Sequence, residues 1–384
     1  MLKDLGLYIH IPFCKSKCYY CDFTSSCNIT DELISKYIDA LCREILENSQ
    51  IISENNITSI YFGGGTPSYI DSKYIKQILE TINYFRDLSN EIEITIEVNP
   101  CSINLNSKLI DYKNMGINRI SIGLQSTHDI ILKKIGRAHL YSDFINTLNY
   151  CKNANITNIS ADLIYPLPGL TTKLLDSSLD ALMDLKDEYN IKHISIYNLE
   201  VHENTKLEFL LNEKYETLVD EDEEILMKRL IERKLETNEY NNYEISNFAI
   251  NNFESVHNTH YWNQGEYLGF GVSAASFFSS CRYQNLANIK DYIFNINNNI
   301  SIVSEKTELD EVDLLKEYVI LKSRLKNGIN LRQFKQKFKV DFKEVFKEQI
   351  EILKSKDLII IDDNNFYLNE KGKDFANIVW QEFI

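Results

Sequence analysis

Three closely spaced cysteines follow an apolar segment in "GLYIHIPFCKSKCYYCDF" (residues 6–23). The apolar part, residues 6–11, has the composition of a buried strand. Cys14, Cys18 and Cys21 then fall within eight residues, and Phe23 stands where a close fourth cysteine would fall. Three thiolates leave one position of a four-ligand metal site without a protein ligand. The stretch therefore predicts a metal centre that can bind a further, non-protein ligand.

Length and charge restrict the classes of protein that the chain can be. The 384 residues suffice for one large and one smaller domain, and the net charge of −15 argues against a nucleic-acid partner. Cys42, Cys101, Cys151 and Cys281 are scattered singly, so no disulfide framework is expected. The apolar stretch 5–13 is too short for a signal peptide or a transmembrane segment. We expect a soluble, cytoplasmic protein with reduced thiols.

Strand-like and helical patterns alternate along the first half of the chain. The strand-like stretches are residues 6–11, 59–64, 93–98, 119–124, 159–165 and 193–199. The clearest helical patterns between them are Asp31–Glu47 and Ser72–Phe85, each with one apolar face. Six strand–helix units predict an α/β fold with a parallel sheet. Because eight units are needed to close such a barrel, we expect an open, partial (β/α)6 barrel.

Residues that could carry chemistry recur near the ends of these strands. They are Cys14, Cys18 and Cys21 after the first strand, "GGGTPS" (63–68) after the second, Glu97 at the end of the third, Gln125 after the fourth, Asp162 in the fifth and Tyr197 in the sixth. In a parallel barrel all of these would project at the carboxyl-terminal rim, where such barrels carry their active sites.

The C-x3-C-x2-C spacing resembles that of radical S-adenosylmethionine (SAM) proteins. The resemblance implies that Cys14, Cys18 and Cys21 bind a [4Fe–4S] cluster, and that the amino and carboxylate groups of SAM bind its open iron. The cofactors then carry the difficult chemistry, while the protein positions them. A structural zinc site with Cys27 as fourth ligand is the alternative.

The same resemblance assigns further residues to SAM. It implies that the glycine-rich loop holds the amino group, that a carboxylate binds the ribose hydroxyls, and that aromatic residues lie beside the cluster and the adenine. These residues are Gly64, Gly65 and Thr66 for the loop, Glu97 for the ribose, and Tyr8 and Tyr20 for the aromatic positions. Gln125, Arg137 and Asp162 match positions that bind a second SAM in related enzymes, with helix capping and ion pairing as their alternative roles.

Further motifs narrow the resemblance to the oxygen-independent coproporphyrinogen III oxidase subgroup. They are "YIHIPFC" (8–14), "RISIGLQS" (119–126), "GRAH" (136–139) and "DLIYPLPG" (162–169). The subgroup has a dehydrogenase branch and a heme chaperone branch, HemW. The dehydrogenase motif has a fourth cysteine where this chain has Phe23, and a long arm where only seven residues precede Tyr8. Both differences favour the HemW branch.

The segment "HNTHYW" (257–262) resembles the H-N-x-x-Y-W motif of HemW. The resemblance implies that His257 holds heme, and imidazole is a good axial ligand for heme iron. A hydrogen-bonded histidine in the core is the alternative, and His260 is a second candidate ligand. Pro166 and Leu170 replace a glycine and a glutamine of the family pattern, and Ala275 replaces a histidine.

The chain is predicted to divide into a barrel (1–235), a connecting segment (236–305) and a C-terminal domain (306–384). In the last, a helix ending at Gly328, two shorter amphipathic helices and a hairpin at 362–365 resemble a winged helix. Its alternating Lys and Glu residues indicate solvated helix faces, not a DNA-binding surface. The acidic run 219–224 predicts the start of a helix.

The predicted function is that of a heme chaperone, with a cluster, SAM and heme as ligands. Its partners would be a heme-acceptor protein and an electron donor such as a flavodoxin or ferredoxin. The first alternative is a coproporphyrinogen III dehydrogenase that oxidatively decarboxylates propionate side chains. The second is a cluster-bearing interaction protein with neither activity.

Overall fold

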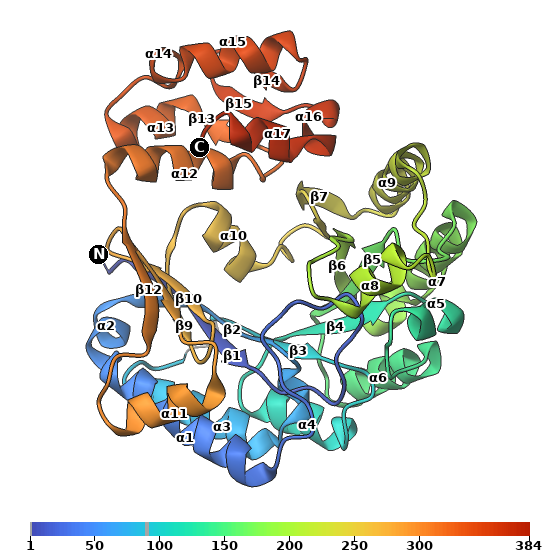
Figure 1. Ribbon diagram of the computed structural model, residues 1–384, viewed down its shortest axis with the longest axis vertical. Coiled ribbons are helices and arrows are strands. Elements are labelled where there is room, and N and C mark those ends of the chain that lie inside the picture. Colours follow the sequence, from blue (N-terminus) through green and yellow to red (C-terminus); the bar gives the residue numbers. More distant parts are fainter. Residues whose placement is uncertain (1, 89–91) are drawn as a thin grey trace.

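Six parallel strands form an open barrel in the computed structural model, which describes residues 2–88 and 92–384 (Figure 1). The strands are neighbours in chain order. They are β1 (Asp4–Ile11), β2 (Asn56–Gly64), β3 (Glu93–Val98), β4 (Arg119–Gln125), β5 (Ile159–Tyr165) and β6 (Ile191–Asn198). The predicted partial (β/α)6 barrel is confirmed.

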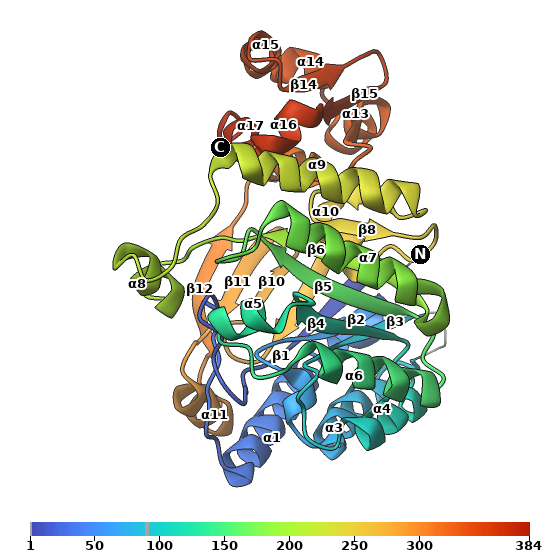
Figure 2. The same cartoon turned by 90° about the vertical axis from the view of Figure 1, so that its right-hand side faces the viewer.

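Helices follow the barrel strands, and most of them cover the outer face of the barrel, whereas α8 (Lys206–Asn212) projects away from it (Figure 1, Figure 2). They are α1 (Asp31–Glu47), α2 (Ser49–Glu54), α3 (Ser72–Asn83), α4 (Leu105–Asn114), α5 (Asp129–Lys134), α6 (Tyr141–Asn153), α7 (Thr172–Tyr189), α8 (Lys206–Asn212) and α9 (Glu221–Thr237), with a 3-10 turn at Pro67–Tyr69. Helix α1 begins where Thr30 accepts the backbone N–H of Leu33, and it buries Ile38, Leu41 and Ile45 against the sheet. The predicted acidic helix start is confirmed, because Asp220 caps α9.

The inner face of the barrel is polar, whereas the outer face is apolar. Alternate residues of a strand point to opposite faces. In β1 the residues Leu7, Ile9 and Ile11 belong to the apolar core, while Tyr8 and His10 bond to each other on the other face. Every other barrel strand also contributes inward polar groups: Ser59 and Tyr61, Thr95 and Glu97, Arg119 and Ser121, Ser160 and Asp162, and His193 and Ser195. Buried polar groups are costly unless they are hydrogen-bonded, so this lumen is held by a network of side-chain bonds.

The predicted connecting segment adds strands to both edges of the barrel sheet. Strands β7 (Asn241–Glu244) and β8 (Asn247–Ala249) pair at the β6 edge, while β9 (Glu266–Phe270), β10 (Ala275–Phe278), β11 (Cys281–Asn285) and β12 (Val303–Glu308) extend the β1 edge. Helix α10 (Val256–Trp262) crosses between the two edges, and α11 (Ile289–Asn297) packs on α1. The predicted domain boundary at 305/306 falls inside β12.

The C-terminal domain has its own small sheet and its own core. Its elements are α12 (Glu311–Lys322), β13 (Ile329–Asn330), α13 (Leu331–Phe338), α14 (Phe342–Val345), α15 (Lys347–Ser355), β14 (Ile359–Ile361), β15 (Asn365–Leu368), α16 (Glu370–Asp374) and α17 (Ala376–Gln381). The predicted hairpin is β14–β15. The helix predicted to end at Gly328 ends at Lys322. Gly328 instead has φ +56°, and a Cβ there would lie 2.1 Å from the Phe366 carbonyl oxygen, so close strand approach requires the glycine.

Two sets of contacts fasten the C-terminal domain to the barrel. Figure 2 shows α9 alongside α16 and α17, where Asp374 accepts Lys228 at 2.5 Å and Arg229 at 2.6 Å. At the other contact, the Arg324 guanidinium lies 4.4 Å from the Trp262 ring and 4.7 Å from the Trp380 ring. Helix α10 is therefore held between the barrel and the C-terminal domain (Figure 1).

Candidate functional site

The cysteine loop is closed at its base by backbone hydrogen bonds. The Cys14 N–H donates to the Ser26 carbonyl at 3.0 Å, and the Ser26 N–H donates to Pro12 at 2.7 Å. Cys14 is buried, whereas Cys18 and Cys21 are half-buried, and all three are free thiols. Burial raises the pKa of Cys14 and raises that of Cys21 to about 11. Metal binding would therefore have to displace the thiol protons.

The glycine-rich loop lies directly against the cysteine loop. The Gly65 N–H donates to Ile11 and the Thr66 N–H donates to Phe13, both at 2.9 Å. A Cβ on Gly65 would lie 2.9 Å from those backbones and 3.1 Å from the Cys14 sulfur. Thr66 Oγ1 is 3.4 Å from the same sulfur. Only a glycine permits the backbone to come this close to the thiol.

The end of β4 and the loop after α5 complete this side of the rim. Arg137 donates to the Gly123 carbonyl at 2.6 Å and to the Cys18 sulfur at 3.4 Å. Gln125 has φ +70°, and its buried Oε1 has no hydrogen-bond partner among the described residues. Burial also raises the pKa of Tyr20, which the neighbouring Arg137 guanidinium opposes. A strained backbone and an unpaired polar atom are typical of a binding site.

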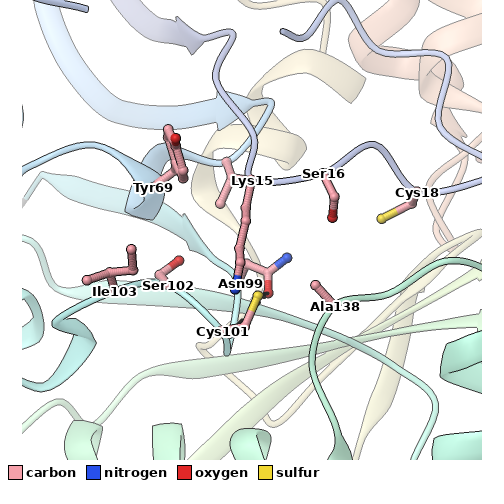
Figure 3. Close-up of a pocket in the computed structure, with 10 residues that line it drawn as sticks. Lys15, Ser16, Cys18, Tyr69, Asn99, Cys101, Ser102, Ile103 and Ala138 are labelled. Carbon is pink, nitrogen blue, oxygen red and sulfur yellow. Dashed lines mark hydrogen bonds between the residues drawn. The ribbon is translucent and has the colours of Figure 1, made fainter. Parts of the chain in front are cut away.

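A small hollow, open to solvent, lies between these loops (Figure 3). Its lining residues are Lys15, Ser16, Cys18, Thr66, Tyr69, Asn99, Cys101, Ser102, Ile103 and Ala138. Figure 3 shows the Cys18 and Cys101 sulfurs directed toward the space between them. Three separate rim loops and the cysteine loop thus face one cavity, as expected for the carboxyl-terminal ends of parallel strands.

Glu97 and Asp162 lie deeper, inside the lumen. The Tyr61 hydroxyl donates to Glu97 Oε1 at 2.8 Å, and burial raises the pKa of Glu97 to about 7. Asp162 accepts Ser121 at 2.8 Å and Ser160 at 3.0 Å, and burial raises its pKa. Both carboxyl groups therefore titrate closer to neutrality than in water.

His257 lies at the opposite, amino-terminal end of the lumen. Its Nδ1 bonds the Ser59 hydroxyl at 2.8 Å, near the start of β2, and its backbone N–H donates to Glu93 at 3.1 Å, the first residue of β3. The ring is stacked on Tyr61 and is only 2% exposed. Burial lowers its pKa to about 3, and Nε2 has no partner among the described residues.

The structure thus brings the cysteine loop, the glycine-rich loop and Arg137 together at the rim. It places Glu97 and Asp162 deeper in the lumen and His257 at the opposite end. In residues 2–88 and 92–384, no three His, Cys, Asp or Glu side chains lie close enough together to hold a metal ion. The predicted aromatic residue Tyr8 lies in the lumen, bonded to His10, whose Nε2 is 3.0 Å from the Thr24 carbonyl oxygen of the cysteine loop. His260 bonds the Glu266 carbonyl at 2.7 Å.

Sequence reasoning missed His10 and Tyr61 as parts of the site. Both follow the two-residue alternation of a strand with a polar inner face: Tyr8 and His10 in β1, and Ser59, Tyr61 and Gly63 in β2. That periodicity was available in the sequence. The location of Cys101 opposite Cys18 had no local signal, since it depends on two distant loops.

The chain is similar to known proteins over its full length. The Radical SAM superfamily matches residues 8–182 and the HemN C-terminal domain matches residues 309–375. The heme chaperone HemW of Lactococcus lactis is 33% identical over 387 residues, covering 100% of this chain and 98% of that protein. This chain belongs to the HemW family. The HemW of Bacillus subtilis is 31% identical, over 98% of each chain.

A solved structure supports the fold of this HemW family member independently. Coproporphyrinogen III oxidase (HemN) from Escherichia coli superposes with a TM-score of 0.85 at 22% identity, covering 100% of this chain and 90% of that chain. Membership of the radical SAM superfamily implies a [4Fe–4S] cluster and SAM. No helix in the described part of the chain has the length and apolar character needed to cross a membrane.

Proposed function

We propose that the protein is a heme chaperone, which binds heme at His257 and delivers it to an acceptor protein. The observation that carries the proposal is the full-length similarity to proteins named heme chaperone HemW. In this proposal Cys14, Cys18 and Cys21 hold a [4Fe–4S] cluster, SAM binds beside it, and a flavodoxin or ferredoxin donates electrons. We place this activity in the cytoplasm.

The rim residues fit a cluster and SAM. Three thiols share one loop, and the glycine-rich loop packs so closely on it that a Cβ on Gly65 would lie 3.1 Å from the Cys14 sulfur. A Cβ on Gly63 would lie 3.2 Å from Glu97 Oε1, so the packing beside the predicted ribose carboxylate favours a glycine at this position. Gly64 and Thr66 would hold the amino group, while Tyr8 and Tyr20 would flank the ligands. The cluster and SAM would supply the one-electron chemistry that gates heme transfer.

Gln125 and Arg137 would serve as polar contacts at the same rim, and Asp162 as one deeper in the lumen. The unpaired Gln125 Oε1 can accept a hydrogen bond from a ligand. Arg137 is anchored through Gly123 and reaches the Cys18 sulfur, so its positive charge would stabilise a cluster thiolate.

His257 has the chemistry of a heme ligand. Its pKa is lowered to about 3 by burial, so the imidazole is neutral at physiological pH. Its Nε2 has no partner among the described residues and is the nitrogen that would bind iron. Because the ring is 2% exposed, heme can reach it only after α10 moves away from the lumen.

The test is a heme titration of the anaerobic, cluster-reconstituted protein, followed by the heme absorption band. The parent is expected to bind heme stoichiometrically. His257→Ala is expected to bind at least about tenfold more weakly, because loss of even a hydrogen-bond partner of a metal ligand has that effect. His260→Ala is the matched control, because His260 is the rival ligand on the same helix. Equal heme binding by parent and His257→Ala would remove His257 from the proposal.

A parallel assay tests the alternative enzyme. The fold similarity to HemN motivates incubation with coproporphyrinogen III, SAM and a reductant, with the tetrapyrrole products followed by mass. No loss of carbon dioxide is expected from the parent. Decarboxylation toward protoporphyrinogen would replace the chaperone proposal with the dehydrogenase. If the protein showed neither heme binding nor turnover, the remaining alternative would be a cluster-bearing interaction protein.

A further inference from the structure

Tyr61 contacts residues from both ends of the barrel lumen. Its hydroxyl donates to Glu97 Oε1 at 2.8 Å, and its ring stacks on His257 with centroids 5.0 Å apart and planes 22° apart. Ser59, two residues earlier on the same strand face, bonds His257 Nδ1 at 2.8 Å. The inner face of β2 thus runs without a break from the proposed heme ligand to the proposed SAM carboxylate.

The packing around Tyr61 leaves little free space. A Cβ on Gly63 would lie 3.0 Å from the Tyr61 ring, 3.1 Å from the Tyr8 ring and 3.2 Å from Glu97 Oε1. Tyr8 stacks on Tyr61 at 6.3 Å, so the phenol is enclosed by Tyr8 on one side and His257 on another. In a close-packed interior, a ring cannot move without moving its neighbours. A displacement of His257 therefore changes the position of Tyr61, and with it the hydrogen bond to Glu97.

We infer that Tyr61 couples the two ligand sites, so that SAM binding and heme binding oppose each other. This inference rests on the proposed function, since it takes Glu97 as the SAM carboxylate and His257 as the heme ligand. Tyr61 is a positioning residue here, because it acts through Glu97 and His257.

The sign of the coupling follows from what each ligand needs. SAM needs Glu97 held in place, and in this structure the Tyr61 hydroxyl holds it while the Tyr61 ring covers His257. Heme needs His257 released from Ser59 and from Tyr61, because the ring is 2% exposed in its present position. Ligands that select opposite states of one element weaken each other's binding by the same factor. SAM would thereby favour heme release.

The experiment measures both affinities on the full-length, cluster-reconstituted protein without a reductant, so that SAM stays intact. Heme is titrated by absorbance with and without saturating SAM, and SAM is titrated by equilibrium dialysis with and without heme. SAM is expected to raise the Kd for heme at least about fivefold, and heme to raise the Kd for SAM by the same factor.

Tyr61→Phe is the decisive variant, because it keeps the stacked ring and removes only the hydroxyl that bonds Glu97. The coupling is expected to fall below about twofold. The Kd for SAM alone is expected to rise about fivefold, as for loss of one hydrogen bond to Glu97, while the Kd for heme alone changes less. Tyr189→Phe is the matched control. It removes a hydroxyl that donates to Asn149 at 3.1 Å, away from the lumen, and should leave the coupling unchanged.

The outcomes separate this inference from the proposed function. A parent that binds both ligands with no coupling, or with SAM tightening heme, overturns the inference and leaves the chaperone proposal in place. If the coupling persists in Tyr61→Phe, the Tyr61 hydroxyl does not couple the two ligand sites. A parent that binds no heme overturns both.

Discussion

The carboxyl-terminal end of the barrel lumen is formed by loops, whereas its amino-terminal end is covered by helix α10. At the loop end, Cys18 and Cys21 are half-buried, and Cys18 lines a hollow that is open to solvent. At the helix end, His257 is 2% exposed and its backbone N–H is bonded to Glu93. One end is therefore accessible to a ligand, while the other must open first.

The comparison shows that the two predicted ligand sites make different demands on the fold. A rim of loops can bind a ligand with small local movements, as is usual for barrel active sites. A histidine buried under a helix can bind heme only in molecules in which the helix has moved away. The smaller the fraction of such open molecules, the weaker the apparent affinity for heme. The predictions below test this difference.

The largest expected effect is the loss of the cluster in Cys18→Ser. With one of three thiolates removed, iron and sulfide should be nearly absent after reconstitution, while the heme titration stays unchanged because His257 lies at the other end. Cys281→Ser, on β11, is the control and should keep its iron. Metal analysis that finds tightly bound zinc in the parent would instead support the four-cysteine alternative with Cys27.

His257 should make a large contribution to the pH dependence of stability at the helix end. Its folded pKa of about 3 lies below the ordinary value of 6.5, so the unfolded chain takes up the proton first. This contribution to stability is complete above pH 6.5 and falls as the pH decreases. Between pH 7 and pH 5 the parent should lose about 2 kcal/mol more unfolding free energy than His257→Gln.

Denaturant unfolding at the two pH values measures that difference. Arg119 and His260 are the charged and titratable groups that also affect His257, and both remain in the variant. Parallel pH profiles of the two proteins would show that the imidazole is already solvated, and would contradict the closed end described here.

A smaller effect is expected where the C-terminal domain holds α10. Arg324→Ala removes the guanidinium between Trp262 and Trp380 and should cost about 1 kcal/mol, the scale of partly desolvated cation–π contacts. Amide hydrogen exchange in α10 should accelerate, and heme should bind faster. Arg332→Ala, an exposed arginine of α13, is the control. Unchanged exchange in α10 would show that the domain does not restrain the helix.

The smallest effect is expected at the loop end, in Phe23→Ser. The Phe23 side chain is 63% exposed, so the free energy of unfolding should change by less than about 0.5 kcal/mol, and cluster content should not change. Thermal unfolding and iron analysis check both. A large loss of stability would mean that the cysteine loop is as tightly packed as the helix end.

The sequence predicted the loop end far better than the helix end. All six barrel strands and the rim order follow from local alternation and from residues that directly follow strands, and the structure confirms that arrangement. Helix α1 matches its predicted bounds because its apolar spacing and its Thr30 cap are local signals. Where both a motif and its position in the fold depend on adjacent residues, the sequence is enough to predict them.

The location of His257 could not be predicted in this way. Its motif identifies a family but not the end of the lumen at which the ring lies, because that depends on α10 crossing from β8 to β9. The partners Ser59 and Glu93 are distant in sequence and carry no motif. The misplaced helix end at Gly328 has the same origin, since the contact with Phe366 that requires the glycine is tertiary.

The two connections of α10 differ in length, so the two ends of the helix would differ in how far they can move. Residues 250–255 join the helix to β8, but only residues 263–265 join it to β9. Within the short connection, Gln264 donates to the Leu314 carbonyl at 2.8 Å and accepts Lys337 at 2.9 Å, which fixes it to the C-terminal domain. At about 3.3 Å of reach per residue, the helix can pivot on this anchored end but cannot leave. His257 lies at the other end of α10, next to the longer connection. The amino-terminal end of the lumen would therefore open by a rotation of α10 about its connection to β9.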